Sequence, residues 1–330
     1  MALLLASLAA AMLWALLAGA YDLGLDEVRR VLWARLGGNV DPHLSRVQEV
    51  IVWNIRMPRL LLAALSGMAL AVAGAAYQGC FRNPLVEPYI LGVSAGAAFG
   101  AALAIVLPQW LPLVRVSAFC GALAAVTLTG LAARSRGFVP PVALVLAGII
   151  VGALFAAVVG VMKYLSADTQ LREITFWMMG GFHYAGWADT RETSLLVLPG
   201  ILCIWLLAWK LNVLSLGDEE ARSLGVNPVR LRRVLVLLAT VCAAACVASS
   251  GIIGWVGLMA PHAARMIFGP DNRWVIPASA LLGAIYLLIC DTLARTLGPG
   301  EIPISILTSV LGAPYLLWLL RVKGRELYGS

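Results

Sequence analysis

The residues that most often carry enzyme chemistry are few in this sequence and lie far apart. The three histidines, His43, His183 and His262, are widely separated, and the HExxH zinc motif does not occur. The six cysteines fall in apolar stretches without a CxxC pair, which predicts buried packing residues and neither a metal site nor a disulfide framework. No lysine belongs to a GxxxxGK[ST] phosphate loop, so ATP hydrolysis by that route is excluded. We predict no catalytic residue, no metal and no cofactor in this chain.

Ionisable residues near apolar stretches raise one alternative, a transporter that is driven by an ion gradient. Such carriers use buried ionisable groups as proton relays. Asp291 and Arg295 are four residues apart, which places them on one face of a helix where they can pair, and Glu301 follows nearby. We interpret this group as structural or as part of a docking surface. The gradient-driven carrier remains the alternative from a different class, and a membrane-embedded enzyme is disfavoured because it lacks a catalytic cluster.

The composition indicates that membrane-spanning helices position these residues. Of the 330 residues, 61% are hydrophobic and only 12% are charged, whereas a soluble domain carries about 25% charged residues. The net charge of +7 falls on the connections between apolar stretches, so nucleic acid is not an expected partner. We predict an all-α integral membrane protein with one polytopic domain, residues 1–330, and about ten transmembrane spans. The spans are expected near residues 1–20, 60–79, 91–107, 116–133, 142–162, 193–209, 231–250, 252–268, 274–294 and 303–320.

An even number of spans places both termini on one side of the membrane. We assign that side to the cytoplasm because it then carries a modest excess of Lys and Arg. Residues 1–20 are interpreted as a retained first span because they lack the basic start of a signal peptide; cleavage near Ala20 is the alternative. Residues 21–56 form a hydrophilic, periplasmic connection with a short amphipathic helix around Asp26–Leu36.

Two apolar stretches are interrupted by breaks rich in Gly and Pro, one in each half of the chain. The breaks cover residues 78–96 and 249–262. Paired breaks of this kind indicate inverted repeats around a transport pathway, and the topology predicts that they face opposite sides. Gly92, Gly96 and Gly100 recur at four-residue spacing, which predicts close helix packing, with a pore-lining face as the alternative.

Residues 214–228 predict a pair of short helices on the cytoplasmic face. Ser215 or Gly217 can cap a helix with an acidic first turn, Gly225 can end it, and Pro228 can open a second one. Apolar residues lie between these caps, which favours a docking surface over an ordinary solvated loop.

Several motifs, taken in order along the chain, resemble the FecCD family of permeases, which serve bacterial importers of iron-siderophores, haem and cobalamin. Together these motifs extend over nearly the whole chain. They are Arg56-Met57-Pro58-Arg59, Asn83-Pro84-Leu85-Val86-Glu87-Pro88, Leu91-Gly92-Val93-Ser94-Ala95-Gly96, Trp177-Met178-Met179-Gly180-Gly181, Gly217-Asp218-Glu219 with Ala221-Arg222 and Leu224-Gly225, Gly254-Trp255-Val256-Gly257-Leu258 with Pro261-His262 and Arg265, and Leu311-Gly312-Ala313-Pro314.

The resemblance implies a homodimeric ABC-importer permease in the bacterial inner membrane, with the pathway along the dimer axis. The implied partners are a second copy of the chain, two cytoplasmic ATPase subunits that bind ATP and Mg, a periplasmic substrate-binding protein and membrane lipid. The chain itself would not be an enzyme. An iron-siderophore is the first expectation for the substrate because iron chelates dominate the family, and cobalamin or haem are the alternatives. Aromatic residues such as Trp177, Phe182 and Trp187 suit a bulky chelate, and His183 is interpreted as structural.

The resemblance also assigns roles by position. The residues assigned to ATPase coupling are Leu216, Gly217, Asp218, Glu219, Glu220, Ala221, Arg222, Leu224 and Gly225. Docking of the binding protein falls to Arg56, Arg59 and Arg295. A cytoplasmic gate falls to Asn83, Pro84, Leu85, Pro141 and Val142. The outer mouth falls to a short helix over Asp168–Gly181 that ends in Trp177, Met178, Met179, Gly180 and Gly181. The loop over residues 137–142 contains Pro140-Pro141 where the cobalamin permease has small hydroxyl residues, which implies a stiffer and less polar second gate.

Overall fold

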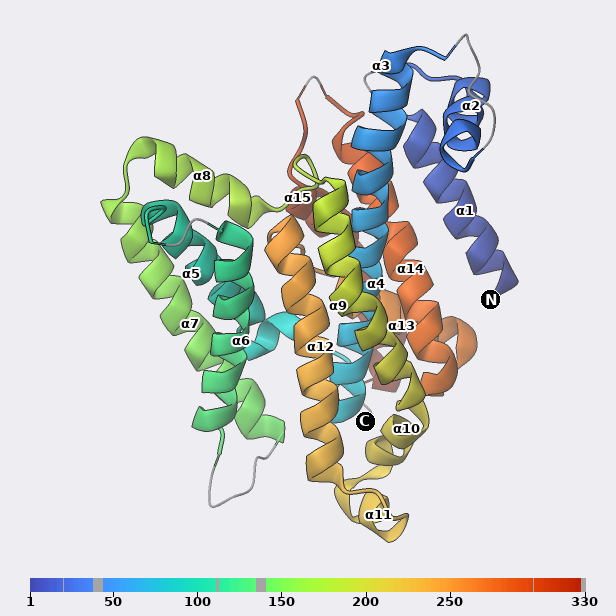
Figure 1. The fold of residues 1–330 in the computed structure, drawn as a ribbon. Coiled ribbons are helices and arrows are strands. Elements are labelled where there is room, and N and C mark those ends of the chain that lie inside the picture. The colour runs from blue at the N-terminus through green and yellow to red at the C-terminus, as the bar shows by residue number, and fades with distance from the viewer. Residues whose placement is uncertain (20, 38–43, 111–112, 135–140, 299, 328–330) are drawn as a thin grey trace.

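The chain folds into helices alone over the part that the computed structural model describes, which is every residue except 20, 38–43, 111–112, 135–140, 299 and 328–330 (Figure 1). Its elements are α1 (Ala2–Leu17), α2 (Leu25–Arg35), α3 (Arg46–Glu49), the π-helix η1 (Val50–Arg56), α4 (Met57–Phe81), the 3-10 helix η2 (Pro88–Leu91), α5 (Val93–Val106), α6 (Val114–Ala132), α7 (Pro141–Leu165), α8 (Asp168–Met179), α9 (Trp187–Leu206), α10 (Ala208–Leu216), α11 (Asp218–Ser223), α12 (Pro228–Ser250), α13 (Val256–Phe268), α14 (Asn272–Ala294) and α15 (Ile304–Leu327).

The longer helices run side by side in Figure 1, so the molecule has two ends. We call the end that carries α2 and α8 the α2 end, and the end that carries α11 the α11 end. Helix α2 matches the short amphipathic helix that the sequence predicts for this region, displaced by one residue.

Helix α4 is the centre of the fold. With α3 and η1 it forms one helical run, Arg46–Phe81, whose most apolar stretch is 89% buried. It packs against α14, α12, α13 and α9. Small residues make this packing possible, since a Cβ at Gly67 would overlap the carbonyl oxygen of Gly283 in α14, and a Cβ at Gly74 would overlap that of Gly257 in α13.

Helices α6 and α7 lie at the periphery, where only 28% and 22% of their apolar stretches are buried. Their exposed side chains are apolar, as expected for helices that face lipid or another subunit. Helix α5 packs on α6 through Gly96 and Gly100, where a Cβ would overlap the carbonyl oxygens of Gly121 and Ser117. The close helix packing predicted from the glycine spacing is therefore confirmed.

Within the described ranges, five helices are long and apolar enough to cross a membrane, and α9 with α10 makes a sixth if that pair, bent by 55°, forms one broken span. Helices α1 and α5 and the first part of α15 are apolar but shorter. The chain is a multi-pass membrane protein. Helix length alone does not identify all ten predicted spans. One reason is that the Gly/Pro-rich breaks shorten α5 and α13 to 14 and 13 residues.

Both predicted breaks are present in the structure. Helix α4 ends where Arg82 adopts a left-handed conformation (φ 52°), and α12 ends before Gly251 (φ 70°). The two breaks also touch: the hydroxyl of Tyr89, in the first, donates to the carbonyl oxygen of Ile253, in the second, and accepts from the Ile253 N–H at 3.1 Å. The broken segments therefore meet inside the protein, and inverted repeats stay a prediction.

Candidate functional site

The segment predicted to meet an ATPase forms one short helix, α11, between α10 and α12 (Figure 1). Gly217 (φ 147°) precedes it and Gly225 (φ 79°) follows it, as the sequence indicates. The side chain of Asn227 accepts a hydrogen bond from the N–H of Arg230 at 3.0 Å, and Pro228 then starts α12 directly. The prediction of two short helices was therefore wrong, because the second cap opens the long apolar helix itself.

Helix α11 is held by a charged contact to the helix bundle. Arg232 of α12, whose side chain is 5% exposed, donates to Asp218 from Nη2 at 2.7 Å. The same guanidinium donates from Nε to the carbonyl oxygen of Cys80, near the end of α4, at 3.1 Å. The hydrogen bonds from Arg232 lower the pKa of Asp218, and Ala221 is buried beside this contact. Arg232 thus links α11 to both α12 and the end of α4.

Apart from the buried Gly217, the other residues assigned to coupling are exposed at the α11 end. Leu216 and Leu224 are 63% and 60% exposed, on either side of α11. Glu219, Glu220 and Arg222 are exposed between them, and Gly225 is exposed beyond. Two exposed leucines around a charged turn make a surface that fits a protein partner, because apolar side chains at the centre of an interface contribute most of the burial.

The three arginines assigned to docking lie together at the α2 end, but their guanidinium groups bind within the chain. Arg59 of α4 donates to Asp291 of α14 from Nε at 3.0 Å and from Nη2 at 2.9 Å. It also donates to both carboxylate oxygens of Glu301, at 2.7 and 3.0 Å. Arg295 Nε lies 3.5 Å from Asp291 Oδ2, so the predicted pairing of these two residues is confirmed. Asp291 is 1% exposed and bridges both arginines.

Arg56 and Arg295 cap the end of α1. Arg56 donates from Nη1 to the carbonyl oxygens of Leu16 and Leu17, at 2.6 and 2.9 Å, and Arg295 donates from Nη1 to that of Ala18 at 2.7 Å. The last carbonyls of a helix lack partners within it and carry partial negative charge, which the two cations satisfy. Arg56, Arg59 and Arg295 therefore join α1, α4 and α14; their docking role stays a prediction.

A cavity of about 670 Å³ lies at the α2 end, between α8, the start of α9, the end of α12 and the start of α6. Trp177, Gly180 and Gly181, three of the residues assigned to the outer mouth, line it, whereas Met178 packs in a small apolar cluster around Ile174. The outer-mouth role stays a prediction. Met179, the last residue of α8, is half-buried and is not among the lining residues. The Gly181 N–H donates to the Ser250 carbonyl oxygen at 2.8 Å, which fixes the end of α8 to the second break.

The cavity also holds charged residues that the sequence analysis did not single out. Arg115 forms ion pairs with Asp189 and, at 3.0 Å, with Glu192, and its buried Nε has no hydrogen-bond partner in the described structure. Arg172 and Glu173 of α8 line the same space. A single arginine at the start of an apolar segment reads as an ordinary membrane-edge anchor, so no local signal marked Arg115.

Two aromatic side chains offered for the substrate lie elsewhere. Phe182 is 1% exposed and belongs to the hydrophobic core. The ring of Trp187 packs on Trp53 with centroids 5.0 Å apart, and its Nε1 donates to the Trp53 carbonyl oxygen at 2.8 Å. Both side chains are used in packing and neither lines the cavity, so their contact with substrate stays a prediction. The aromatic residues at the cavity are Trp177, Phe176 and Tyr184.

The residues of the predicted gate lie in two places. Asn83, Pro84 and Leu85 are exposed just after α4, where the Asn83 side chain accepts a hydrogen bond from the Leu85 N–H at 2.9 Å. Pro141 begins α7, and Val142 is 79% exposed there. Residues 137–140, with the first proline of the Pro-Pro pair, lie outside the described residues, so the character of this second gate stays a prediction.

One stretch has the spacing of a catalytic motif, although we predict no catalytic residue in this chain. Residues Gly92 to Gly96 have the GxSxG spacing of the serine-hydrolase nucleophile elbow. That elbow needs a strand, a sharp turn and a helix, but here Ser94 follows the 3-10 helix η2 and lies in the first turn of α5. Gly96 instead packs on α6, so these glycines have a packing role.

Comparison with known proteins shows the family to which this chain belongs. The sequence profile of the FecCD transport family matches residues 7–322. The chain belongs to the FecCD transport family. It is 48% identical over 283 residues to the hemin transport system permease protein HmuU of Yersinia pestis, covering 83% of this chain and 84% of HmuU. It is 41% identical over 274 residues to the cobalamin import system permease protein BtuC of Halobacterium salinarum, covering 83% and 74%.

The fold agrees with this membership in the FecCD family. A solved inward-facing structure of an ABC transporter described as of metal-chelate type superposes with a TM-score of 0.85, at 35% identity, over 96% of this chain and 97% of that one. The chain is therefore a permease of the ABC-importer class, and a gradient-driven carrier is disfavoured. The relatives are named as permeases, in agreement with the prediction that the chain is not an enzyme.

Proposed function

We propose that this FecCD permease carries a bulky metal chelate across a bacterial inner membrane as a homodimer of ten-span subunits. The observation that carries the proposal is the exposed α11 surface, joined through Asp218 and Arg232 to the central helices. Such a geometry suits a chain that performs no covalent chemistry and receives motion from a partner. The α11 end would be cytoplasmic, with both termini on that side, and the α2 end would be periplasmic.

The proposed cycle divides the work between several polypeptides. A substrate-loaded binding protein docks at the α2 end, where Arg56, Arg59 and Arg295 lie. ATP with Mg binds to two ATPase subunits at the α11 end, and their closure moves α11. Because Arg232 links α11 to α12 and to the end of α4, this motion reaches the gate residues that follow α4. The pathway is then closed alternately at one end and at the other. This chain itself binds no cofactor.

The first test of this proposal is the α11 surface. Replacing Glu219 and Arg222 together with Ala is expected to lower ATP-driven uptake at least tenfold, since both side chains are exposed where the ATPase would dock. Asp26→Ala with Arg29→Ala is the matched control, because this exposed i,i+3 acid–base pair lies on α2. Uptake and binding-protein-stimulated ATP hydrolysis are measured in proteoliposomes. Equal activity of the two double variants would contradict the coupling assignment.

The substrate is proposed to be an organic metal chelate, with iron-siderophore as the sequence-based expectation. Haem is the second candidate, because HmuU is named for hemin and because the cavity at the α2 end combines Trp177, Phe176 and Tyr184 with Arg115 and Arg172. Aromatic faces suit a planar macrocycle, and guanidinium groups suit its carboxylates. Cobalamin is the third candidate.

The substrate test uses the complete importer in proteoliposomes. The binding protein is loaded in turn with ferric siderophore, haem or cobalamin, and ATP-dependent uptake is followed. We expect uptake of one chelate class at least tenfold above the others. Uptake by the permease alone under a proton or sodium gradient would overturn the whole proposal, whereas ATP-dependent uptake of a non-chelate would overturn only the substrate.

A further inference from the structure

A second cavity, of about 350 Å³, lies near the α11 end between α6 and α12, with the start of α7 at its side. Its walls are mostly apolar: Val126 and Leu131 come from α6, Val236 and Leu237 from α12, and Leu144 from α7, with Thr127 and Thr129 of α6 as further lining residues. Leu131 and Leu237 are about equally exposed, at 61% and 60%, so the cavity opens as a groove onto the outer surface of the helix bundle.

Two arginines give the groove a cationic end. Arg134 follows the last turn of α6, and Arg233 lies in the second turn of α12, so both are at the α11 end of their helices. Neither has an acidic partner within the described residues, and no Asp or Glu is found among the described residues that line the groove. Arg232, the third arginine at the groove, is occupied by Asp218 and the Cys80 carbonyl.

An apolar groove with two cations at one end, neither paired with an acid among the described residues, fits an amphiphile that carries negative charge at one end. The groove lies on the lateral face of a membrane protein, and basic pockets between transmembrane helices bind anionic lipid headgroups. A soluble anion would leave the apolar walls without a partner, and a zwitterionic lipid would bring a cation next to the two guanidinium groups. The chemistry therefore selects an anionic glycerophospholipid from the leaflet at the α11 end.

We propose that the groove between α6 and α12 is a binding site for one anionic phospholipid. Its phosphate lies between Arg134 and Arg233, and one acyl chain follows Val126, Leu131 and Leu237. The bound lipid joins α6 and α7 to α12 next to the Arg232–Asp218 contact that holds α11. The lipid would thus be a structural ligand of the helices that carry the coupling surface. This site depends only on the chain's being embedded in a membrane, and not on its substrate or its ATPase.

Glycine at position 130 supplies a way to close the groove without removing a charge. Gly130 lines the cavity, and a Cβ there would meet no described atom within 4 Å, so Gly130→Leu fills the groove without a clash against the backbone. Gly160→Leu is the matched control, because Gly160 lies on the neighbouring helix α7, also has no described atom within 4 Å of a Cβ, and lies outside this groove.

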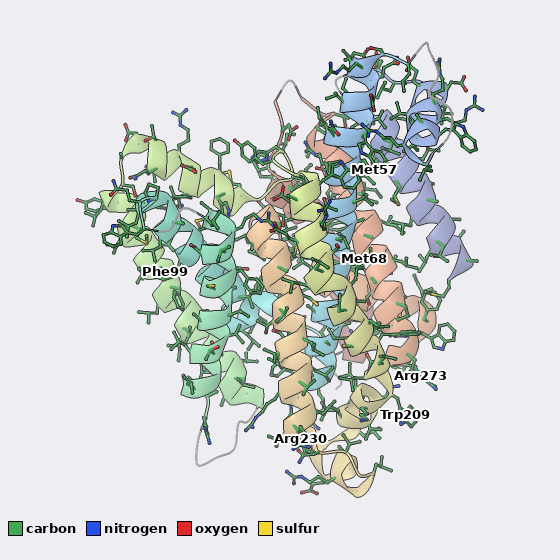
Figure 2. The ribbon with its side chains drawn as sticks, in the orientation of Figure 1. Met57, Met68, Phe99, Trp209, Arg230 and Arg273 are labelled. Carbon is green, nitrogen blue, oxygen red and sulfur yellow. The ribbon has the colours of Figure 1, made fainter. Side chains whose placement is uncertain are left out.

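The test is native mass spectrometry of the detergent-purified protein titrated with phosphatidylglycerol, phosphatidylcholine or inorganic phosphate. Wild type is expected to bind phosphatidylglycerol more tightly than phosphatidylcholine. The Arg134→Gln, Arg233→Gln double variant is expected to bind it roughly 30-fold more weakly, since each basic residue near the surface strengthens binding about fivefold. Gly130→Leu is expected to lose the bound lipid while Gly160→Leu keeps it. Arg230→Gln, at an exposed arginine on the same end of α12 (Figure 2) but outside the groove, is expected to have no effect.

Three results would overturn the inference. The first is equal binding of phosphatidylglycerol and phosphatidylcholine. The second is retention of the lipid by both the double arginine variant and Gly130→Leu. The third is displacement of the lipid by millimolar inorganic phosphate, which would show that the arginines bind a free anion and that the apolar walls contribute nothing. If the arginine variants do not fold, the comparison of Gly130→Leu with Gly160→Leu tests the inference by itself.

Discussion

Replacing Asp291 with Asn is expected to destabilise the protein by about 3–5 kcal/mol, because it removes one partner of a buried ion pair. Asp291 is 1% exposed and receives three hydrogen bonds from Arg59, and Arg295 Nε lies 3.5 Å away. Without the carboxylate, these two buried cations repel each other and keep only Glu301 as a common acidic neighbour. The loss also reaches α1, since Arg295 holds the last carbonyls of that helix.

Thermal unfolding of the detergent-purified protein measures this effect, with the yield of folded protein as a second readout. Asp26→Asn is the control, because the Asp26–Arg29 pair has nearly the same length, 3.0 Å, but its side chains are 77% and 78% exposed. Exposed pairs contribute about 0.2–1 kcal/mol. Equal shifts for Asp291→Asn and Asp26→Asn would show that the cluster at the α2 end does not hold the helices together.

The same cluster changes how the predicted docking arginines must be tested. Arg59→Glu would place a third carboxylate beside Asp291 and Glu301, in a site that is 1% exposed at Asp291. Lost affinity for a binding protein would then follow from a distorted α2 end as readily as from a missing contact. A docking measurement on this variant has meaning only if its unfolding temperature matches that of wild type.

The sequence predicted those features that depend on residues close to one another along the chain. The acidic first turn of α11, Gly217 before it and Gly225 after it form a helix with its caps within about ten residues, and the structure confirms them. The close packing of α5 on α6 follows in the same way from the spacing of Gly96 and Gly100.

The burial of the arginines could not be predicted from such signals, because their partners are distant in the chain. Arg59 binds Asp291, which is 232 residues away, and Arg115 binds Asp189, which is 74 residues away. A charge at the end of an apolar segment looks alike whether it meets solvent, a partner protein or a buried carboxylate. The contact between the two breaks could not be predicted for the same reason, since Tyr89 and Ile253 are 164 residues apart in the chain. The length and hydropathy of the apolar segments indicate a membrane protein. Which charged side chains remain unpaired depends on contacts between residues that are distant in the chain.

Replacing Asp218 with Asn is expected to release α11 from α12 and to lower ATP-driven uptake at least tenfold. The amide cannot form the ion pair with Arg232, and a hydrogen bond to a charged group contributes about 1.5–3 kcal/mol. Arg232 keeps its bond to the Cys80 carbonyl, so the loss falls on α11 and leaves the bundle intact. Hydrogen exchange of the α11 amides measures the release. For this exchange measurement alone, Glu220→Gln, at an exposed residue of the same helix, is the control. Protected α11 amides in Asp218→Asn would exclude this contact as the link between α11 and the bundle.

The dependence on pH gives an independent check of this link. The hydrogen bonds from Arg232 lower the pKa of Asp218 in the folded state. The contact therefore contributes fully above the ordinary Asp pKa of about 4, and the contribution is lost as the pH falls below that value through the folded pKa. Corrected for intrinsic exchange rates, the protection of α11 in wild type should exceed that in Asp218→Asn at pH 6. The difference should shrink below pH 4, because protonated Asp218, like Asn, carries no charge. A difference that persists at low pH would mean that the side chain holds α11 by its shape and not by its charge.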